Sequence, residues 1–137
     1  MSFTAREART GKIVTLSVIE AAVRSAWSLE TCDPVDVPLW HSGNPARGQC
    51  GVTALVLQDL LGGDLLVAEV EYADGGRQGV HYWNRLAGGI EVDLTREQFT
   101  DGERIGAPSV APRPPGGRPA RCADQYDLLR NRVLAAV

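Results

Sequence analysis

Two stretches of the chain repeat their apolar residues at the three- and four-residue steps that place side chains on one face of an α-helix. The first covers residues 15–28 and sets four apolar side chains on one side: Val18, Ile19, Ala22 and Ala26. Ser17, followed three residues later by Glu20, resembles the capping box that begins many helices. The pattern therefore predicts an amphipathic helix, which Trp27 closes.

The second stretch, residues 50–61, is apolar almost all the way round. Its chief polar residues are Thr53, Gln58 and Asp59. A helix of this kind is buried rather than half exposed. Gly62–Gly63 ends it, because glycine tolerates the left-handed conformation found at helix C-termini. We predict a central, mostly buried helix with Cys50 at its first position.

Residues that alternate between apolar and polar predict β-strands after this helix. Residues 64–72 set four side chains on one face: Leu66, Ala68, Val70 and Tyr72. The sequence Ala-Asp-Gly-Gly at residues 73–76 is typical of a hairpin turn. Two further strands are expected at residues 79–85 and 89–94.

The register of these last two strands decides which side chains meet. If residues 86–88 form a three-residue loop, His81 stands directly opposite Asp93, with Cβ atoms about 4.5 to 5.5 Å apart. A two-residue turn at Gly88–Gly89 would instead oppose Asn84 to Asp93 and turn His81 to the other side. We favour the three-residue loop because its opposite face is largely apolar. That face carries Tyr82, Asn84, Ile90, Val92 and Leu94.

Loops and two shorter helices account for the rest of the chain. Residues 29–48 contain three prolines and two glycines and predict a long surface loop that leads to the central helix. A second capping box at Thr95–Gln98 begins a short helix that buries Phe99. Residues 100–119, rich in proline and glycine, predict an extended or mobile connection. A C-terminal helix at residues 124–135 turns three side chains inward: Tyr126, Leu129 and Val133.

Together these elements predict one α+β domain over residues 1–137. In it the central Cys-bearing helix packs on an antiparallel sheet of three or more strands, flanked by the N- and C-terminal helices. A length of 137 residues suits a single domain whose core needs no disulfide or metal. The sequence does not indicate an oligomeric state.

Charge and composition exclude several classes of partner. The 14 basic and 17 acidic side chains give a net charge of −3, and the arginines are scattered, which argues against nucleic-acid binding. No run of apolar residues is long enough for a membrane span, and none follows the charged N-terminus as in a signal peptide. We therefore expect a cytoplasmic protein. Its cysteines, Cys32, Cys50 and Cys122, are odd in number and lack CxxC spacing, which indicates reduced thiols.

Cys50, His81 and Asp93 are the candidate catalytic residues. A thiol at a helix N-terminus feels the positive end of the helix dipole, which lowers a thiol pKa and favours the thiolate. A histidine within reach can take the thiol proton, and a carboxylate behind it orients the ring and supports its charge. The alternative is a purely structural role, in which Cys50 is a small core residue and His81 a structural histidine.

Further polar and aromatic residues near Cys50 have possible roles at such a site. The side chain of Gln49, or of Asn44, together with the cysteine N–H, would stabilise an oxyanion. Arg47 would bind a substrate carboxylate through its bidentate fork, although an exposed, solvated arginine fits equally well. Trp83 and Trp40 would wall the site, and plain packing is the alternative for both.

Three motifs carry a resemblance to known families. NPARGQCGVTALVLQDLLGG, HYWNRL and EVDLTREQF resemble the small bacterial YunG-like proteins, from about Trp27 to Phe99 and more weakly in the last helix. A Cys-bearing helix followed by His and Asp on successive strands also resembles the core of transglutaminase-like and papain-like thiol enzymes. That second resemblance implies Cys50 as nucleophile, His81 as base and Asp93 as orienting carboxylate.

The predicted function is acyl transfer or amide hydrolysis through a thioester on Cys50, with a small-molecule or peptide acyl substrate and no cofactor. The main alternative is a non-catalytic binding module on the same scaffold, since a fold does not imply a function. A zinc site is disfavoured, because its candidate ligands lie 9, 9 and 31 residues apart and lack the short paired spacing of structural zinc sites. Those ligands are Cys32, His41, Cys50 and His81.

Overall fold

The computed structural model describes residues 14–137. The charged N-terminus, from which we predicted that there is no signal peptide, lies outside the described residues. The helices of the described chain are α1 (Leu16–Ala26), α2 (Cys50–Leu61) and α3 (Ala123–Ala136). Its strands are β1 (Asp64–Glu71), β2 (Arg77–Arg85), β3 (Glu91–Val92), β4 (Arg104–Ile105) and β5 (Ser109–Ala111). The fold is therefore α+β with an antiparallel sheet of more than three strands, as the sequence predicts.

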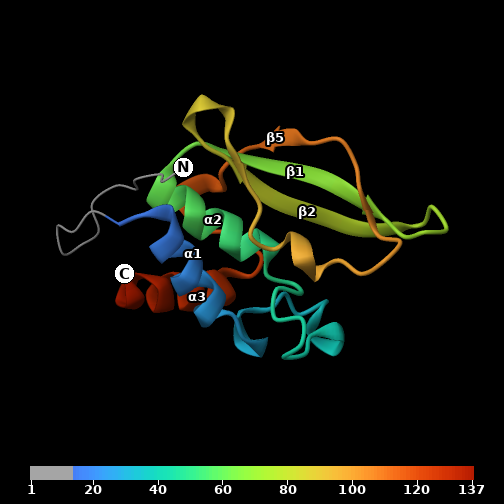
Figure 1. Cartoon of the computed structure of the whole chain (residues 1–137), viewed down its shortest axis with the longest axis horizontal. Coiled ribbons are helices and arrows are strands. Elements are labelled where there is room, and N and C mark those ends of the chain that lie inside the picture. The colour runs from blue at the N-terminus through green and yellow to red at the C-terminus, as the bar shows by residue number, and fades with distance from the viewer. Residues whose placement is uncertain (1–13) are drawn as a thin grey trace.

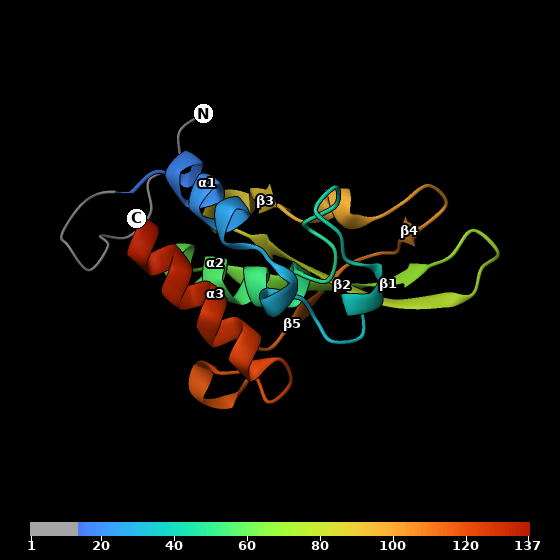
Figure 2. The same ribbon diagram turned by 90° about the horizontal axis from the view of Figure 1, so that it is seen from below.

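The sheet has the order β3-β2-β1-β4, and β5 also pairs with β1. Figure 1 shows α2 between this sheet and the two outer helices, while the β1–β2 hairpin projects beyond them. In Figure 2 the outer helices lie on either side of α2. The main core fills the space around α2 with fully buried side chains from four elements: Ile19, Val23, Val56, Leu57, Leu65, Leu129 and Val133. The predicted inward positions of the C-terminal helix are confirmed.

α1 begins two residues before the predicted capping box. The Thr15 hydroxyl accepts a hydrogen bond from the backbone N–H of Val18 at 3.3 Å, so Thr15 caps the helix and Ser17 lies inside it. Val18, predicted to be inside, is 47 % exposed, because it lies at the edge of the buried face. The buried side chains of α1 are Ile19, Ala22, Val23 and Ala26.

α2 has the predicted bounds. Gly62 and Gly63 follow it at φ 71° and 81°, and a Cβ on Gly63 would stand 2.4 Å from the backbone oxygen of Arg85. Glycine is thus required where the chain turns closely past β2. Thr53, predicted as a polar break, is buried, because its hydroxyl accepts a 2.9 Å hydrogen bond from the indole N–H of Trp27.

The register between β2 and β3 differs from both registers considered for the sequence. Arg85 pairs with Glu91, which leaves five residues, 86–90, in the loop instead of three. The loop is longer because Gly88 and Gly89 both adopt positive φ and form a further turn. An offset of two residues preserves the alternation of faces. His81 therefore keeps the side of the strand that the three-residue loop would have given it, although it is not directly opposite Asp93.

Two other predictions need correction. Thr95–Gln98 forms only a 3-10 turn at Arg96–Gln98 without the predicted side-chain cap, and it buries Gln98 while Phe99 stays half-buried. The Pro/Gly-rich segment 100–119 contains β4 and β5, both paired with β1. β1 ends at Glu71, and Tyr72 is exposed.

Asn84 is a buried polar residue on the sheet face that packs against α2. Its side-chain N–H donates to the backbone oxygen of Ala54 in α2 at 2.9 Å, which explains a polar residue on a largely apolar face. We expect Asn84→Ala to lower the free energy of unfolding by about 1.5 kcal/mol, since a buried hydrogen bond is lost. Asn131→Ala, an exposed change on α3, is the control and should shift the denaturation midpoint little. Equal midpoints for the two variants would contradict this role.

Candidate functional site

Cys50 is the first residue of α2, and the loop before it is shaped by a glycine. Gly48 has φ 73°, and a Cβ there would lie 2.5 Å from the Cys32 sulfur. The first helical hydrogen bond runs from the Thr53 N–H to the Gln49 oxygen at 3.0 Å. The N–H groups of the first helical residues therefore have no acceptor within the helix and point toward its N-terminal end. Cys50 is half-buried there and lines a cavity of about 700 Å³.

His81, on β2, is fully buried and held on several sides. Its Nε2 lies 2.7 Å from Oδ2 of Asp93. The Trp83 ring stacks on it at a centroid distance of 5.3 Å, and the Phe99 ring meets it edge-on at 4.9 Å. The two-residue change of register did not separate His81 from Asp93, because both side chains stay on one face and the carboxylate reaches diagonally.

The charge of His81 is controlled by its neighbours. Burial lowers the pKa of His81, but hydrogen bonding to Asp93 and to Cys50, with the charges of both, raises it to about 9. Since Asp93 faces Nε2, Nδ1 is the nitrogen left for Cys50. The ring is therefore protonated at neutral pH. The structure pairs His81 with Asp93, and the effect of Cys50 on the pKa of His81 indicates that the thiol lies near the ring.

Gln49 does not point into the cleft. Its amide N–H donates to the Ser28 oxygen at 3.0 Å, and its Oε1 accepts from the Thr31 hydroxyl at 2.7 Å. The side chain is fully buried in this network. The predicted oxyanion role is corrected accordingly, because both ends of the amide are already used to fix the loop before α2.

Arg47 and Asn44 are also structural rather than placed for substrate. The Arg47 guanidinium is buried and pairs with Glu103 at 3.1 Å and Asp36 at 3.4 Å. The amide of Asn44 donates to the backbone oxygen of Gln98 at 2.9 Å. Both residues thus anchor the turn that carries Gln98 and the segment after it, instead of binding an acyl substrate.

The two tryptophans have different places. Trp83 is buried behind His81, and its indole N–H donates to Glu91 at 2.6 Å. It supports the imidazole from behind. Trp40 donates to the backbone oxygen of Pro45 at 3.1 Å and stabilises its own loop. The packing alternative therefore describes Trp40, which does not line the cavity beside Cys50.

Gln98 is a site residue that the sequence did not reveal. Its Oε1 accepts from the Gly48 N–H at 3.1 Å, so its NH₂ group must face the other way, where it lies 3.5 Å from His81 Nδ1. Gln98 lines the same cavity as Cys50. In the sequence it completes a capping-box pattern, so nothing in the pattern points to the cleft.

The candidate zinc ligands do not gather. Within residues 14–137 no three His, Cys, Asp or Glu side chains lie close enough to share a metal ion. Cys32 is buried, donates to the Arg47 oxygen at 3.3 Å, and has its pKa raised to about 12 by burial. His41 accepts from the Gly43 N–H at 3.1 Å within its own loop.

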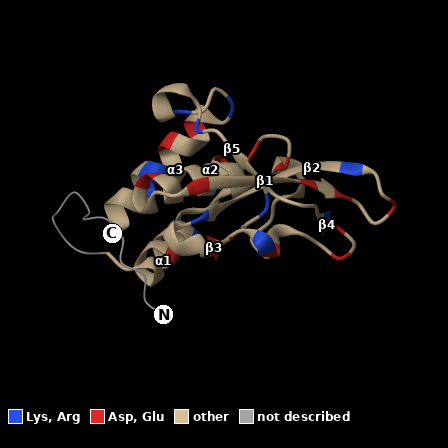
Figure 3. Cartoon of the chain, turned by 90° about the horizontal axis from the view of Figure 1, so that it is seen from above, with Lys and Arg blue, Asp and Glu red and all other residues tan. Residues whose placement is uncertain are grey.

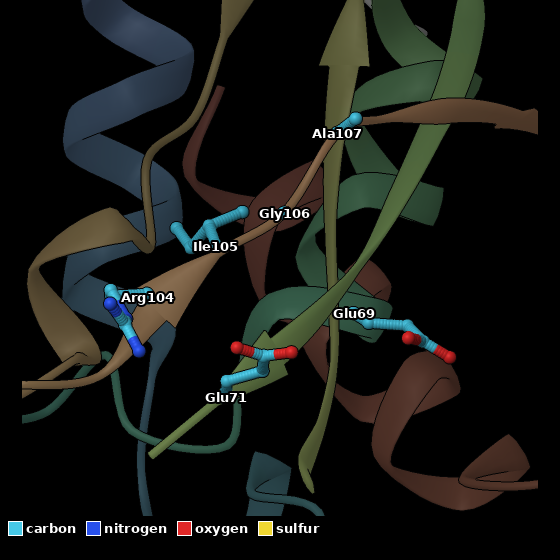
Figure 4. A pocket seen from close by; sticks show the side chains of 6 residues that line it. All are labelled: Glu69, Glu71, Arg104, Ile105, Gly106 and Ala107. Carbon is cyan, nitrogen blue, oxygen red and sulfur yellow. The ribbon is translucent and has the colours of Figure 1, made fainter. Parts of the chain in front are cut away.

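A second cavity, of about 550 Å³, lies beside β1 and β4. Figure 4 shows Glu69 and Glu71 extending from β1 near Arg104 of β4, with the backbone of Gly106 beside them. Ile105 and Ala107 complete its lining, which contains no cysteine, serine, threonine or histidine. Figure 3 shows basic and acidic residues interspersed over the elements of the described chain.

The fold and the cleft define a small α+β protein whose central helix begins with a cysteine beside a buried His–Asp pair. The chain belongs to the YunG family, whose model, described as YunG protein, matches residues 15–137. It is 32% identical over 81 residues to the "Uncharacterized protein YunG" of Bacillus subtilis (strain 168), an alignment that covers 59% of this chain and 60% of that relative. No solved structure matches the chain, so the transglutaminase-like and papain-like resemblance remains a prediction.

Residues 14–137 contain no candidate membrane-spanning helix. None of the helices described there combines the length and the apolar character that crossing a bilayer requires. The prediction that the chain does not span a membrane by a helix agrees with this finding.

The pKa of His81 should lie far above that of an ordinary histidine. We expect NMR of the ring nitrogens to show the charged form through neutral pH and loss of the proton near pH 9. Because the folded pKa lies above the ordinary value of 6.5, the bound proton stabilises the fold fully below pH 6.5 and less as pH rises through about 9. Asp93→Asn should lower the midpoint. A wild-type midpoint near 6.5 would show that the pairing is absent in solution.

Proposed function

We propose that this protein is a cysteine-dependent acyl-transferring or amide-hydrolysing enzyme in which Cys50 is the nucleophile, His81 the general base and Asp93 the orienting carboxylate. The observation that carries the proposal is the buried His81 ring, whose Nε2 lies 2.7 Å from Asp93 and whose pKa is raised by both Asp93 and Cys50. A base held by a carboxylate and facing a thiol is the arrangement that nucleophilic catalysis requires.

The first step forms an acyl-enzyme. At neutral pH His81 already holds the proton, and the thiolate sulfur of Cys50 bonds to the acyl carbonyl carbon. The bond from that carbon to the leaving amine breaks, and the proton on His81 moves to the amine nitrogen. A thioester on Cys50 and a free amine result, with the imidazole neutral.

The second step releases the acyl group. Water, or a second amine, attacks the thioester carbon and gives its proton to His81. The carbon–sulfur bond breaks, and Cys50 leaves as a thiolate beside the imidazolium. The products are a carboxylic acid or a new amide. Asp93 orients the ring and stabilises it whenever the ring is charged.

Gln98 is the donor that best suits the oxyanion formed in both steps. Its carbonyl end is fixed by Gly48, and its NH₂ group lies beside the reacting nitrogen of His81. The N–H groups at the start of α2 would supply further donors near the sulfur. Such preorganised donors stabilise the negative charge of the tetrahedral intermediate more than the charge of the substrate.

The proposal is tested by trapping the acyl group. With p-nitrophenyl acetate, we expect intact mass to show one acetyl group and peptide mapping to place it on Cys50 rather than Cys122. Cys50→Ala should abolish the adduct, and His81→Ala should slow its formation about 100-fold, since the base is lost. Folding of each variant is checked by circular dichroism. A protein that binds acyl compounds but yields no adduct with any activated ester or amide would be the non-catalytic binding module.

Gln98 can be separated from His81 by comparing two reactions. We expect Gln98→Leu to slow acylation of Cys50 about 100-fold, because an oxyanion forms in that reaction. Alkylation of Cys50 by iodoacetamide forms no oxyanion, so its rate should change by about twofold or less. Asn44→Ala is the control, since it loosens the same turn through the backbone oxygen of Gln98 and leaves the NH₂ group in place. Equal losses in acylation and alkylation would assign Gln98 a structural role.

A further inference from the structure

The cavity beside Cys50 has an apolar wall that begins next to the sulfur. α2 contributes Val52 and Leu55, which follow Cys50 along the helix. The sheet contributes Val80 and Tyr82 from β2 and Ala111 from β5. The cavity volume of about 700 Å³ lies within the range of sites that enclose small organic ligands.

The far side of this wall is the Pro-rich segment after β5, and it is fixed rather than loose. Arg113 donates to the backbone oxygen of Leu55 at 3.2 Å and to Oε1 of Gln58 at 3.1 Å, and it pairs with Asp59 at 2.9 Å. A further bond at 3.0 Å reaches the oxygen of Gly117 within the segment itself. One guanidinium thus ties the segment to α2, so the apolar wall exists before any ligand binds.

From this wall we infer that the acyl group carried by Cys50 is an extended apolar one, an alkyl chain of several carbons or an aromatic ring, lying between α2 and β2. The inference rests on the proposed acyl transfer at Cys50. The carbonyl carbon would sit at the sulfur beside His81 and Gln98, and the rest of the acyl group would replace water against Val52, Leu55, Val80 and Tyr82. Each methylene buried there strengthens binding by about fourfold.

The length of the acyl chain is the variable that tests the inference. The p-nitrophenyl esters of acetate, butyrate and octanoate share one leaving group, and their reaction with free cysteine corrects for intrinsic reactivity. Below the concentration at which octanoate esters form micelles, we expect the corrected rate of Cys50 acylation to rise at least about tenfold from acetyl to octanoyl.

Narrowing the cavity beside this wall should reduce the preference for the octanoyl group. Val80 lines the cavity yet is 39 % exposed, so Val80→Trp can be accommodated without disturbing the core. We expect it to cut octanoyl transfer about tenfold more than acetyl transfer, because the longer chain reaches further along the wall. Val110→Trp is the matched control, because Val110 on β5 is 55 % exposed and does not line the cavity. Circular dichroism confirms that each variant is folded.

The outcomes separate the inference from the proposed function. If no ester acylates Cys50, the proposed function fails, and the inference fails with it. If all three esters acylate Cys50 at similar corrected rates, the proposed function stands and the inference is overturned. An octanoyl preference that Val80→Trp leaves intact would also overturn it, since the chain would then lie elsewhere.

Discussion

A buried imidazole needs a polar partner at each ring nitrogen, and the neighbourhood of His81 is arranged to provide both. Asp93 takes Nε2 at 2.7 Å, the Gln98 NH₂ group lies 3.5 Å from Nδ1, where it can donate when the ring is neutral, and Cys50 raises the pKa of the ring. The carboxylate and the sulfur offset the cost of burying a charged ring, and two aromatic rings hold its plane. Because the ring can neither turn nor leave, β2, the start of α2 and the segment after β3 must meet at this one point.

The polar residues that the sequence predicts to contact substrate instead hold the loops around His81 in place. Gln49 fixes the loop before α2, and Arg47 with Glu103 holds the turn after β3. A buried ion pair is poorly suited to binding a substrate, because Arg47 would have to leave Glu103 and so leave a buried charge uncompensated. It is well suited to positioning. Gln98 can be aimed at His81 only because its backbone oxygen and its Oε1 are both tied to the loop around Gly48.

Apolar periodicity was enough to predict α2 in full, the inward face of α3 and the course of β1 and β2, because burial of apolar surface decides those elements. It also predicted the alternation of faces that keeps His81 and Asp93 together. The lengths of turns and the hydrogen-bond partners of side chains were harder to predict from the sequence. The loop at residues 86–90 gained two residues through paired positive-φ glycines, and Gln98 carried only a capping signature. Hydrogen-bond networks depend on contacts between distant segments, which no local pattern encodes.

The Pro-rich segment shows how composition alone can mislead about order. Proline and glycine lower the number of apolar contacts a segment can make, which favours a mobile linker in isolation. Here β5 gains backbone hydrogen bonds from β1, and Arg113 gains acceptors on α2. A few directional bonds therefore replace a hydrophobic anchor. Proline then becomes an advantage, because a chain already stiff loses less entropy when those bonds fix it against the cleft.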